Sequence, residues 1–225
     1  MPIAVVGMGC RFPAGANSPE KFWQLLMSGK DAIGDVPASR WNQEYFHSDD
    51  RSKRGAMVAP QGGFIDDIDG FDNSFFNFST LEAANMDPQQ RLLLQVSWEA
   101  LEQGTVPCND WAGKEVGVFM GCFTMDYHLM QFLDPLELGA FASTGIMNSM
   151  LANRISYAFD FKGPSMSVDT ACSGSLTALH LACSSLQKGE SAMAIAGGSM
   201  LMLLPDYHIA ESKTCLLYTS DAADE

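Results

Sequence analysis

The chain has 225 residues, of which 47% are hydrophobic and 18% are charged, and its formal net charge is −14. This length is enough for one sizeable domain with its own core, or for part of a larger one. The acidic balance excludes nucleic acid as the expected partner, because phosphate binding needs clustered lysine and arginine. Neither a long apolar run nor a basic segment leading into an apolar one occurs. We therefore expect no membrane span, no signal peptide and a cytoplasmic location.

The amino-terminal part predicts a short buried strand followed by a helix. Residues 3–6 are apolar and end in Gly7-Met8-Gly9, which is typical of a strand entering a tight turn. A dinucleotide loop is not expected there, because Phe12 stands where the third glycine is needed and no helix begins at the turn. We therefore expect no bound cofactor. The following helix should start at Ser18-Pro19 and end near Ser28-Gly29, with its aromatic residues in the core.

A long ordered excursion should follow over residues 31–78, which are rich in Gly, Asp, Asn and Pro and have weak periodicity. Apolar anchors at residues 62–65 and 71–78 should hold it against the domain. Ser79 then resembles a capping-box start, and Asp87-Pro88 restarts a helix that should run from about Gln89 to Gln103.

Three apolar, β-capable runs in the second half predict buried strands, and they cover residues 116–121, 164–168 and 192–198. Helical patterns separate them, with a break expected around residues 143–145 inside the segment 136–157. Strands that alternate with helices indicate an α/β fold with a mostly parallel sheet.

Six cysteines are scattered along the chain without the cysteine or histidine spacing of a zinc site, so we expect no metal. Cys172 differs from the others because it lies in VDTACSGSL, residues 168–176, where a strand runs through a tight turn into a helix. Backbone N–H groups and the positive end of the helix dipole favour a thiolate at that point. We therefore interpret Cys172 as a nucleophile. The alternative is a small buried hydrophobic residue; a serine hydrolase is disfavoured because no G-x-S-x-G elbow is present.

The motif DTACSGSL at residues 169–176 resembles the active-site motif of β-ketoacyl synthases. The likeness is greatest to type I polyketide synthases, particularly iterative highly reducing ones. Further family-like motifs follow one another in the expected order: IAVVGMGCRFP at 3–13, MDPQQRLLL at 86–94, NRISY at 153–157, GPS at 163–165 and AGGS at 196–199. The resemblance covers roughly residues 2–214, and we interpret residues 1–214 as the truncated N-terminal portion of a ketosynthase domain.

This resemblance implies the first half of a thiolase-like fold, which is layered α/β/α/β/α in the full domain. It also implies that Cys172 accepts an acyl group carried on the phosphopantetheine of an acyl carrier protein. A decarboxylative Claisen condensation with a malonyl-type thioester follows in such enzymes, with help from two histidines and a lysine downstream of this chain. A homodimer is implied for the full domain. Two alternatives remain open: a fatty acid synthase ketosynthase, and an inactive fragment or interaction module.

The last eleven residues, 215–225, depart from the family pattern. They look like the translation of a transposase adapter used in sequencing libraries. We interpret them as non-native and exclude them from reasoning about the fold.

Overall fold

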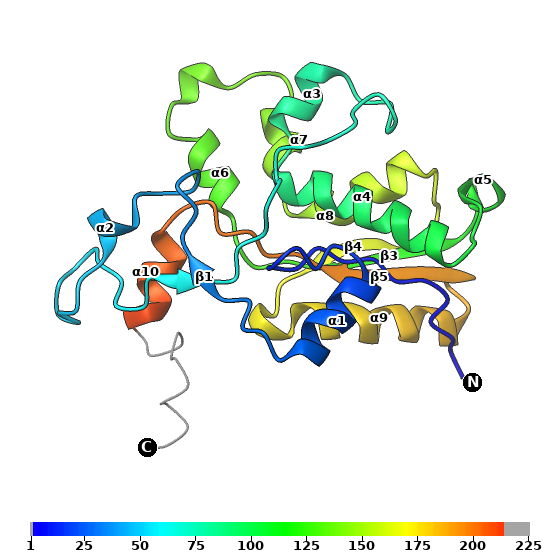
Figure 1. Cartoon of the computed structure of the whole chain (residues 1–225). Coiled ribbons are helices and arrows are strands. Elements are labelled where there is room, and N and C mark those ends of the chain that lie inside the picture. The colour runs from blue at the N-terminus through cyan, green and yellow to red at the C-terminus, as the bar shows by residue number, and fades with distance from the viewer. Residues whose placement is uncertain (1, 214–225) are drawn as a thin grey trace.

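The computed structural model describes residues 2–213, and a three-stranded parallel sheet lies at its centre (Figure 1). The strand order is β4 (Ser165–Val168), β3 (Val116–Gly121) and β5 (Met193–Gly198). The central strand, β3, pairs with both neighbours in parallel and is buried along its whole length. The parallel sheet predicted from the three apolar runs is therefore confirmed.

Helices cover both faces of this sheet (Figure 1). On one side lie α4 (Pro88–Gln103) and α8 (Ser149–Ala158), and on the other lies α9 (Gly174–Lys188). The predicted helix restart is confirmed, because Asp87 caps α4 and Pro88 occupies its first turn. The result is a layered α/β arrangement, as the alternation of helix and strand patterns predicts.

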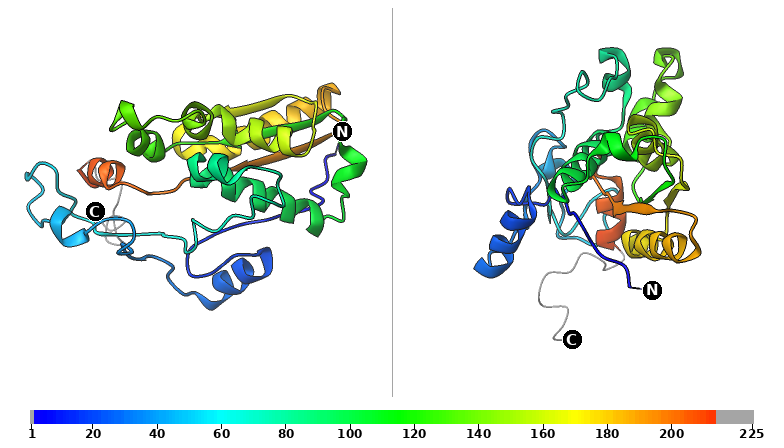
Figure 2. Two further views of the ribbon diagram at one scale, coloured as in Figure 1. Left: turned by 90° about the horizontal axis from the view of Figure 1, so that it is seen from above. Right: turned by 90° about the vertical axis from the view of Figure 1, so that its right-hand side faces the viewer.

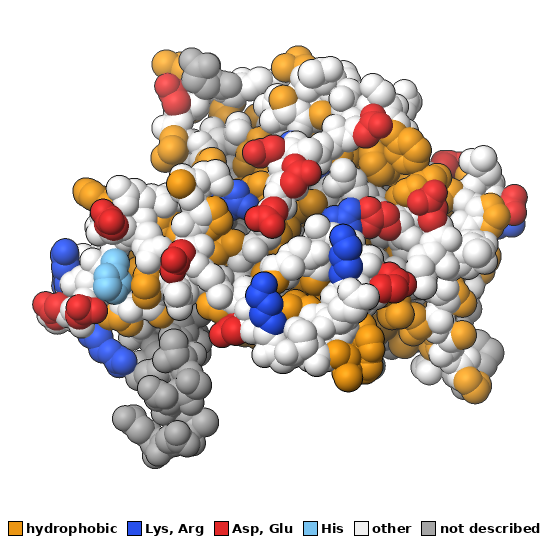
Figure 3. Space-filling model, in the orientation of Figure 1, with side chains coloured by type: hydrophobic (Ala, Val, Ile, Leu, Met, Phe, Trp, Pro, Cys, Tyr) orange, Lys and Arg blue, Asp and Glu red, His pale blue; other side chains and the backbone are white. Residues whose placement is uncertain are grey.

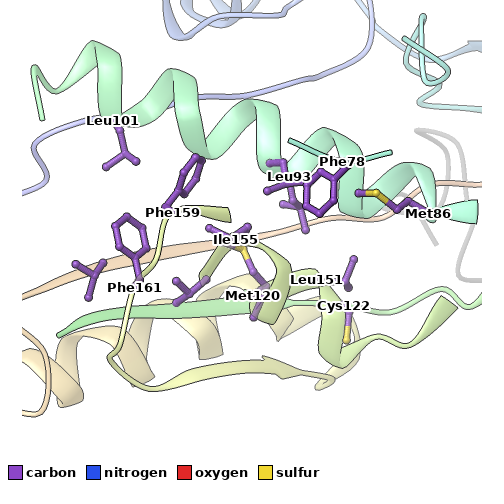
Figure 4. Close-up of a cluster of buried hydrophobic side chains, with 14 residues drawn as sticks. Phe78, Met86, Leu93, Leu101, Met120, Cys122, Leu151, Ile155, Phe159 and Phe161 are labelled. Atoms are coloured by element: carbon purple, nitrogen blue, oxygen red, sulfur yellow. The ribbon is translucent and has the colours of Figure 1, made fainter. Parts of the chain in front are cut away.

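The main hydrophobic core lies between α4, α8 and β3 (Figure 4). Leu94 of α4, Ile155 of α8 and Val118 of β3 are each 0% exposed. Three phenylalanines close the same cluster, namely Phe78, Phe159 and Phe161. Phe78 belongs to the anchor segment predicted at residues 71–78, so that segment does hold the excursion against the domain.

Residues 31–78 form the expected excursion with only short regular pieces: β1 (Gly34–Asp35), α2 (Gln43–Phe46) and β2 (Gln61–Gly62). The β1–β2 pair is antiparallel and belongs to a separate small sheet. A satellite cluster around buried Trp41 and Met57 supports this region. It includes Phe64 from the other predicted anchor segment.

The helix predicted near the amino terminus, α1 (Pro19–Ser28), has the expected ends but not the expected burial. The Ser18 side chain accepts a hydrogen bond from Lys21 N–H at its start, and Gly29 adopts a left-handed φ of 63° at its end. None of its residues is buried, and Trp23 is 63% exposed. The expectation that its aromatic residues are core is therefore wrong. The helix stands apart from the layered body (Figure 2) and contacts the preceding segment through Phe22 and Phe12.

The strand expected over residues 3–6 is also wrong within the described chain. These residues pair with no described strand, and Val5 is 75% exposed. Gly7 and Gly9 do not form a tight turn; instead they let the extended chain cross α4 closely. A Cβ at Gly7 would lie 2.0 Å from the carbonyl oxygen of Ala100. Close approach to a helix, rather than turning, is what these glycines permit.

Short helical pieces connect β3 to α8: α6 (Asp126–Gln131), the 3₁₀ turn η1 (Pro135–Glu137) and α7 (Ala142–Ile146). The break predicted at residues 143–145 is wrong, because α7 runs through it and the chain becomes extended at Met147. Gly145 has a packing role instead, because a Cβ added at this position would lie 1.9 Å from the carbonyl oxygen of Asn85.

Three further helices complete the described chain: α3 (Thr80–Asn85), α5 (Cys108–Trp111) and α10 (Asp206–Lys213). Ser79 caps α3 as the capping-box signal predicts, accepting a hydrogen bond from Glu82 N–H at 3.1 Å. Across residues 2–213, none of the helices has the length and apolar character needed to span a membrane. The adapter-like residues 215–225 lie outside the described residues.

Candidate active site

The three sheet strands end side by side, and this shared edge carries the candidate site. Gly121 of β3 is in register with Val168 of β4 and Gly198 of β5. Because the strands are parallel, the segments that leave them all emerge at the same edge, where sites in α/β folds are usually built. One of these segments contains Cys172.

The turn between β4 and α9 is held by its own side chains. Asp169 Oδ1 accepts a hydrogen bond from Ala171 N–H at 2.9 Å, and Ala171 has a φ of 51°. Ser173 Oγ donates to the carbonyl oxygen of Thr170 at 2.8 Å, and the Thr170 and Thr177 hydroxyls lie 2.9 Å apart. A left-handed alanine is uncommon and costs free energy, so the surrounding bonds must impose this conformation.

Cys172 occupies the 3₁₀ turn η2 (Ala171–Ser173), directly before α9, and it is exposed. The first amide-to-carbonyl bond of the turn runs from Ser173 N–H to Thr170. The Cys172 amide therefore precedes the bonded part of the helix, at the positive end of the α9 dipole. Within residues 2–213 the Cys172 side chain is exposed, whereas the alternative interpretation predicts a buried one.

Cys122 shows what a buried cysteine looks like at the same edge. It follows β3, is 5% exposed, and directs its Sγ to the carbonyl oxygen of Val168 at 3.6 Å. Burial raises the pKa of the Cys122 thiol, and the charge of Asp169 raises it further. Cys122 is thus a packing residue, whereas Cys172, at the same edge of the sheet, is accessible.

Glycines bring the first turn of α9 into backbone contact with the ends of the sheet. A Cβ at Gly121 would lie 2.4 Å from the carbonyl carbon of Gly174, and one at Gly198 would lie 3.0 Å from Ser175 Cβ. The close backbone approach predicted for residues 197–198 is confirmed at Gly198. Contact between the backbone at the end of β3 and the backbone at the start of α9 thus sets the position of the first turn of α9.

The four histidines are held on other parts of the described chain. His208 is buried against the carbonyl oxygen of Ala59 at 2.7 Å, and His128 stacks on Phe132. His47 lies 3.6 Å from Asp49. His180 follows Cys172 by eight residues, which is about 12 Å along a helix. None is therefore placed as a partner base of the sulfur in residues 2–213.

Sequence reasoning missed a set of buried polar residues at the same edge. Asp87 is 3% exposed and Gln89 is 2% exposed, and Ser199 Oγ donates to Gln89 Oε1 at 3.1 Å. Burial raises the pKa of Asp87 to about 6, although hydrogen bonds from Gln89 oppose the rise. The polar residues of MDPQQR, residues 86–91, are evident in the sequence. Periodicity alone, however, does not distinguish a polar residue that caps a helix from one that makes a buried tertiary contact.

A second buried carboxyl, Asp126, ties together the segments that follow β3 and β5. Its Oδ2 accepts hydrogen bonds from Leu203 N–H at 2.8 Å and Leu204 N–H at 2.9 Å. Burial raises the pKa of this carboxyl as well. In the part of the chain that the structure describes, no group of His, Cys, Asp and Glu side chains could hold a metal ion.

Comparison with known proteins gives consistent matches. The family model described as the N-terminal domain of beta-ketoacyl synthase matches residues 1–224. The chain is 46% identical over 216 residues to one of the phenolphthiocerol/phthiocerol polyketide synthase subunits of Mycobacterium tuberculosis, covering 96% of this chain and 14% of that protein. It is 47% identical over 216 residues to the reducing polyketide synthase ppsB of Aspergillus oryzae, covering 96% and 9% respectively.

Solved structures with the same arrangement are also ketosynthases. The oxazolomycin ketosynthase domain OzmH KS7 of Streptomyces albus JA3453 has a TM-score of 0.86 and 36% identity, covering 93% of this chain and 37% of that one. The ketosynthase from module 6 of the bacillaene synthase of Bacillus subtilis 168 has a TM-score of 0.83 and 33% identity, covering 94% and 34%. The chain thus spans a minor part of each of these relatives. The fold is the N-terminal half of the thiolase-like arrangement.

Proposed function

The chain belongs to the β-ketoacyl synthase family, and from this premise we propose that it supplies the acyl-accepting part of a polyketide synthase ketosynthase. Cys172 is the proposed nucleophile. The observation that carries the proposal is the exposed Cys172 side chain at the N-terminal end of α9, on the edge where three parallel strands end.

The proposed first step is transfer of an acyl group to sulfur. The Cys172 thiolate attacks the carbonyl carbon of an acyl thioester carried by phosphopantetheine, and a new C–S bond forms. The bond to the phosphopantetheine sulfur breaks, and that thiolate takes up the proton that Cys172 gave up. The Cys172 backbone N–H is positioned as one donor to the negatively charged oxygen of the intermediate.

The proposed second step is chain elongation in the whole enzyme. A malonyl-type thioester loses carbon dioxide, its enolate carbon attacks the acyl-cysteine, and Cys172 leaves as a thiolate. This step needs histidines near the sulfur, and the four in this chain lie elsewhere. We therefore assign to residues 2–213 the acyl-loading half of the reaction, with an acyl carrier protein domain as the delivering partner. The names of the relatives favour polyketide over fatty acid synthesis.

The test is to incubate the full chain with hexanoyl-N-acetylcysteamine thioester and to measure its intact mass. We expect one hexanoyl adduct, which peptide mapping places on Cys172. Cys172→Ala should remove it. Cys183→Ala is the matched control, because Cys183 lies on α9, the helix that directly follows Cys172, but is half-buried. This variant should keep the adduct.

A chain that takes up no hexanoyl group at high thioester concentration would sink the proposal. So would an adduct that persists in Cys172→Ala. Circular dichroism of both variants checks that each retains the fold of the parent. Adding a malonyl thioester after loading should give no condensation product, because the described residues include no histidine beside the sulfur.

A further inference from the structure

Two hydrogen bonds of the buried Gln89 side chain, one buried and one part-buried, join the start of α4 to the end of β5. Gln89 Nε2 donates to Asp87 Oδ2 at 3.3 Å, and Gln89 Oε1 accepts from Ser199 Oγ at 3.1 Å. Gln89 is 2% exposed. A buried amide is costly unless its polar atoms are paired, and here the two ends of the side chain are both used.

Ser199 connects this buried amide to the strands. It is the first residue after β5, and its N–H donates to the carbonyl oxygen of Gly121 at 3.1 Å. Gly121 in turn lies against Gly174, where an added Cβ would come within 2.4 Å of the carbonyl carbon. Gly174 is only two residues from Cys172. Gln89 is therefore linked through Ser199 to Gly121, the residue that borders the first turn of α9.

From these contacts we infer that Gln89 is a positioning residue for Cys172, acting through Ser199. By fixing the end of β5 and the carbonyl of Gly121, the Gln89–Ser199 bond sets the surface on which the first turn of α9 rests. The geometry of the thiol and its neighbouring amide then depends on a side chain that does not itself touch the sulfur. This inference rests on the proposed acyl-accepting role of Cys172.

The experiment compares two serines, each of which contributes one hydroxyl to a buried or half-buried hydrogen bond. Ser199→Ala removes the donor to Gln89, and Ser199→Thr keeps a hydroxyl. Ser185→Ala is the matched control, because the Ser185 and Ser191 hydroxyls lie 2.8 Å apart near the other end of α9. Two rates at Cys172 are measured in the full chain by peptide mass: acylation by hexanoyl-N-acetylcysteamine thioester and alkylation by iodoacetamide.

We expect Ser199→Ala to slow the acylation of Cys172 by about tenfold, because small misplacements of a reacting group cost large factors in rate. Ser199→Thr should restore the rate to within about twofold. Ser185→Ala should lower the thermal midpoint as much as Ser199→Ala does but should leave both rates unchanged. A merely structural role for Ser199 predicts the same rates in both alanine variants, and that result would overturn the inference.

A double-mutant cycle tests the link between the two side chains. If Gln89 acts through Ser199, the double variant Gln89→Met/Ser199→Ala should be no slower than Gln89→Met alone. Losses that multiply would contradict the inference. If the parent chain takes no hexanoyl group, the proposed function fails, but the iodoacetamide rates still decide whether Gln89 and Ser199 position the sulfur.

Discussion

The two faces of the central sheet pack against their helices in different ways, although a single strand contributes side chains to both. Along β3, successive side chains alternate between the faces. Val116, Val118 and Met120 join the large core with α4 and α8, and each is at most 1% exposed. Gly121 meets α9 on the other face, and Phe119 packs there against alanines.

The helices repeat the contrast. Large buried residues of α4 and α8 fill one side, whereas α9 buries only small ones: Gly174, Ala178, Ala182 and Ser185. Leu176 and Leu179 of α9 are 69% and 48% exposed. On the side of the molecule drawn in Figure 3, hydrophobic side chains reach the surface among acidic and a few basic ones. One face thus provides most of the hydrophobic stabilisation, while the other brings the backbone of α9, and with it Cys172, close to the sheet.

The largest expected effect on the acylation rate comes from adding a side chain at Gly121, where the sheet lies closest to α9. In Gly121→Ala the new Cβ would lie 2.4 Å from the carbonyl carbon of Gly174 and 2.5 Å from Ser175 N. Both neighbours are backbone atoms, so the first turn of α9 must move. We expect acylation of Cys172 to fall about a hundredfold or more, and the free energy of unfolding to fall by about 3 kcal/mol.

Gly139→Ala is the control for this substitution, because a Cβ at Gly139 would meet nothing within 4 Å. It should leave both the rate and the stability unchanged. If Gly121→Ala acylates at the parental rate, backbone contact does not set the position of the turn, and the comparison of the two faces loses its functional meaning.

The parallel sheet and the start of α4 could be predicted from the sequence, because the signals for them are local and periodic. The apolar runs predict all three sheet strands, and the Asp87-Pro88 cap predicts the start of α4. The strand–turn–helix pattern around Cys172 was also correct, since a run of small residues between a strand and a helix has few other interpretations. The role of Cys172 stays a prediction.

The errors arose where tertiary contacts decide the structure. Gly7 and Gly9 stand in a sequence typical of a turn, yet their function is to let the chain pass close to the backbone of α4. No local sequence pattern encodes that contact. The helix break expected around residues 143–145 is wrong for the same reason, because Gly145 packs against the backbone of Asn85. The Gln89–Ser199 bond joins residues 110 positions apart, so a single sequence gives no signal for it.

The same Leu→Ala substitution should cost more unfolding free energy in α4, on one face of the sheet, than in α9, on the other. Leu94 of α4 is 0% exposed in the main core, whereas Leu179 of α9 is 48% exposed. We expect Leu94→Ala to lower the free energy of unfolding by about 3–4 kcal/mol. Leu179→Ala should lower it by less than about 1 kcal/mol. Urea denaturation measures both. Each change is Leu to Ala within a helix, so the difference in helix propensity is the same in both variants. Equal losses of unfolding free energy would show that α9 buries more than the side that faces the sheet.

The effect that depends on pH belongs to Asp87, the N-cap of α4, on the face of the sheet that packs against α4 and α8. Burial raises the pKa of this carboxyl from 3.8 to about 6, so the folded chain holds its proton more tightly than the unfolded chain does. The resulting stability is fully present below pH 3.8 and is lost as the pH rises through 6. Relative to Asp87→Asn, the parent should lose about 2–3 kcal/mol of unfolding free energy over this window.

Denaturation midpoints of the parent and of Asp87→Asn at about pH 4, 5, 6 and 7 measure this difference. The asparagine keeps an oxygen that can accept from Gln89 N–H, so the cap at the start of α4 survives. Asp126 also titrates with a raised pKa, but it is present in both chains and its effect cancels. A constant difference between the parent and Asp87→Asn across the series would mean that water reaches this carboxyl, and that the face packed against α4 and α8 is less tightly closed than the burial of Asp87 indicates.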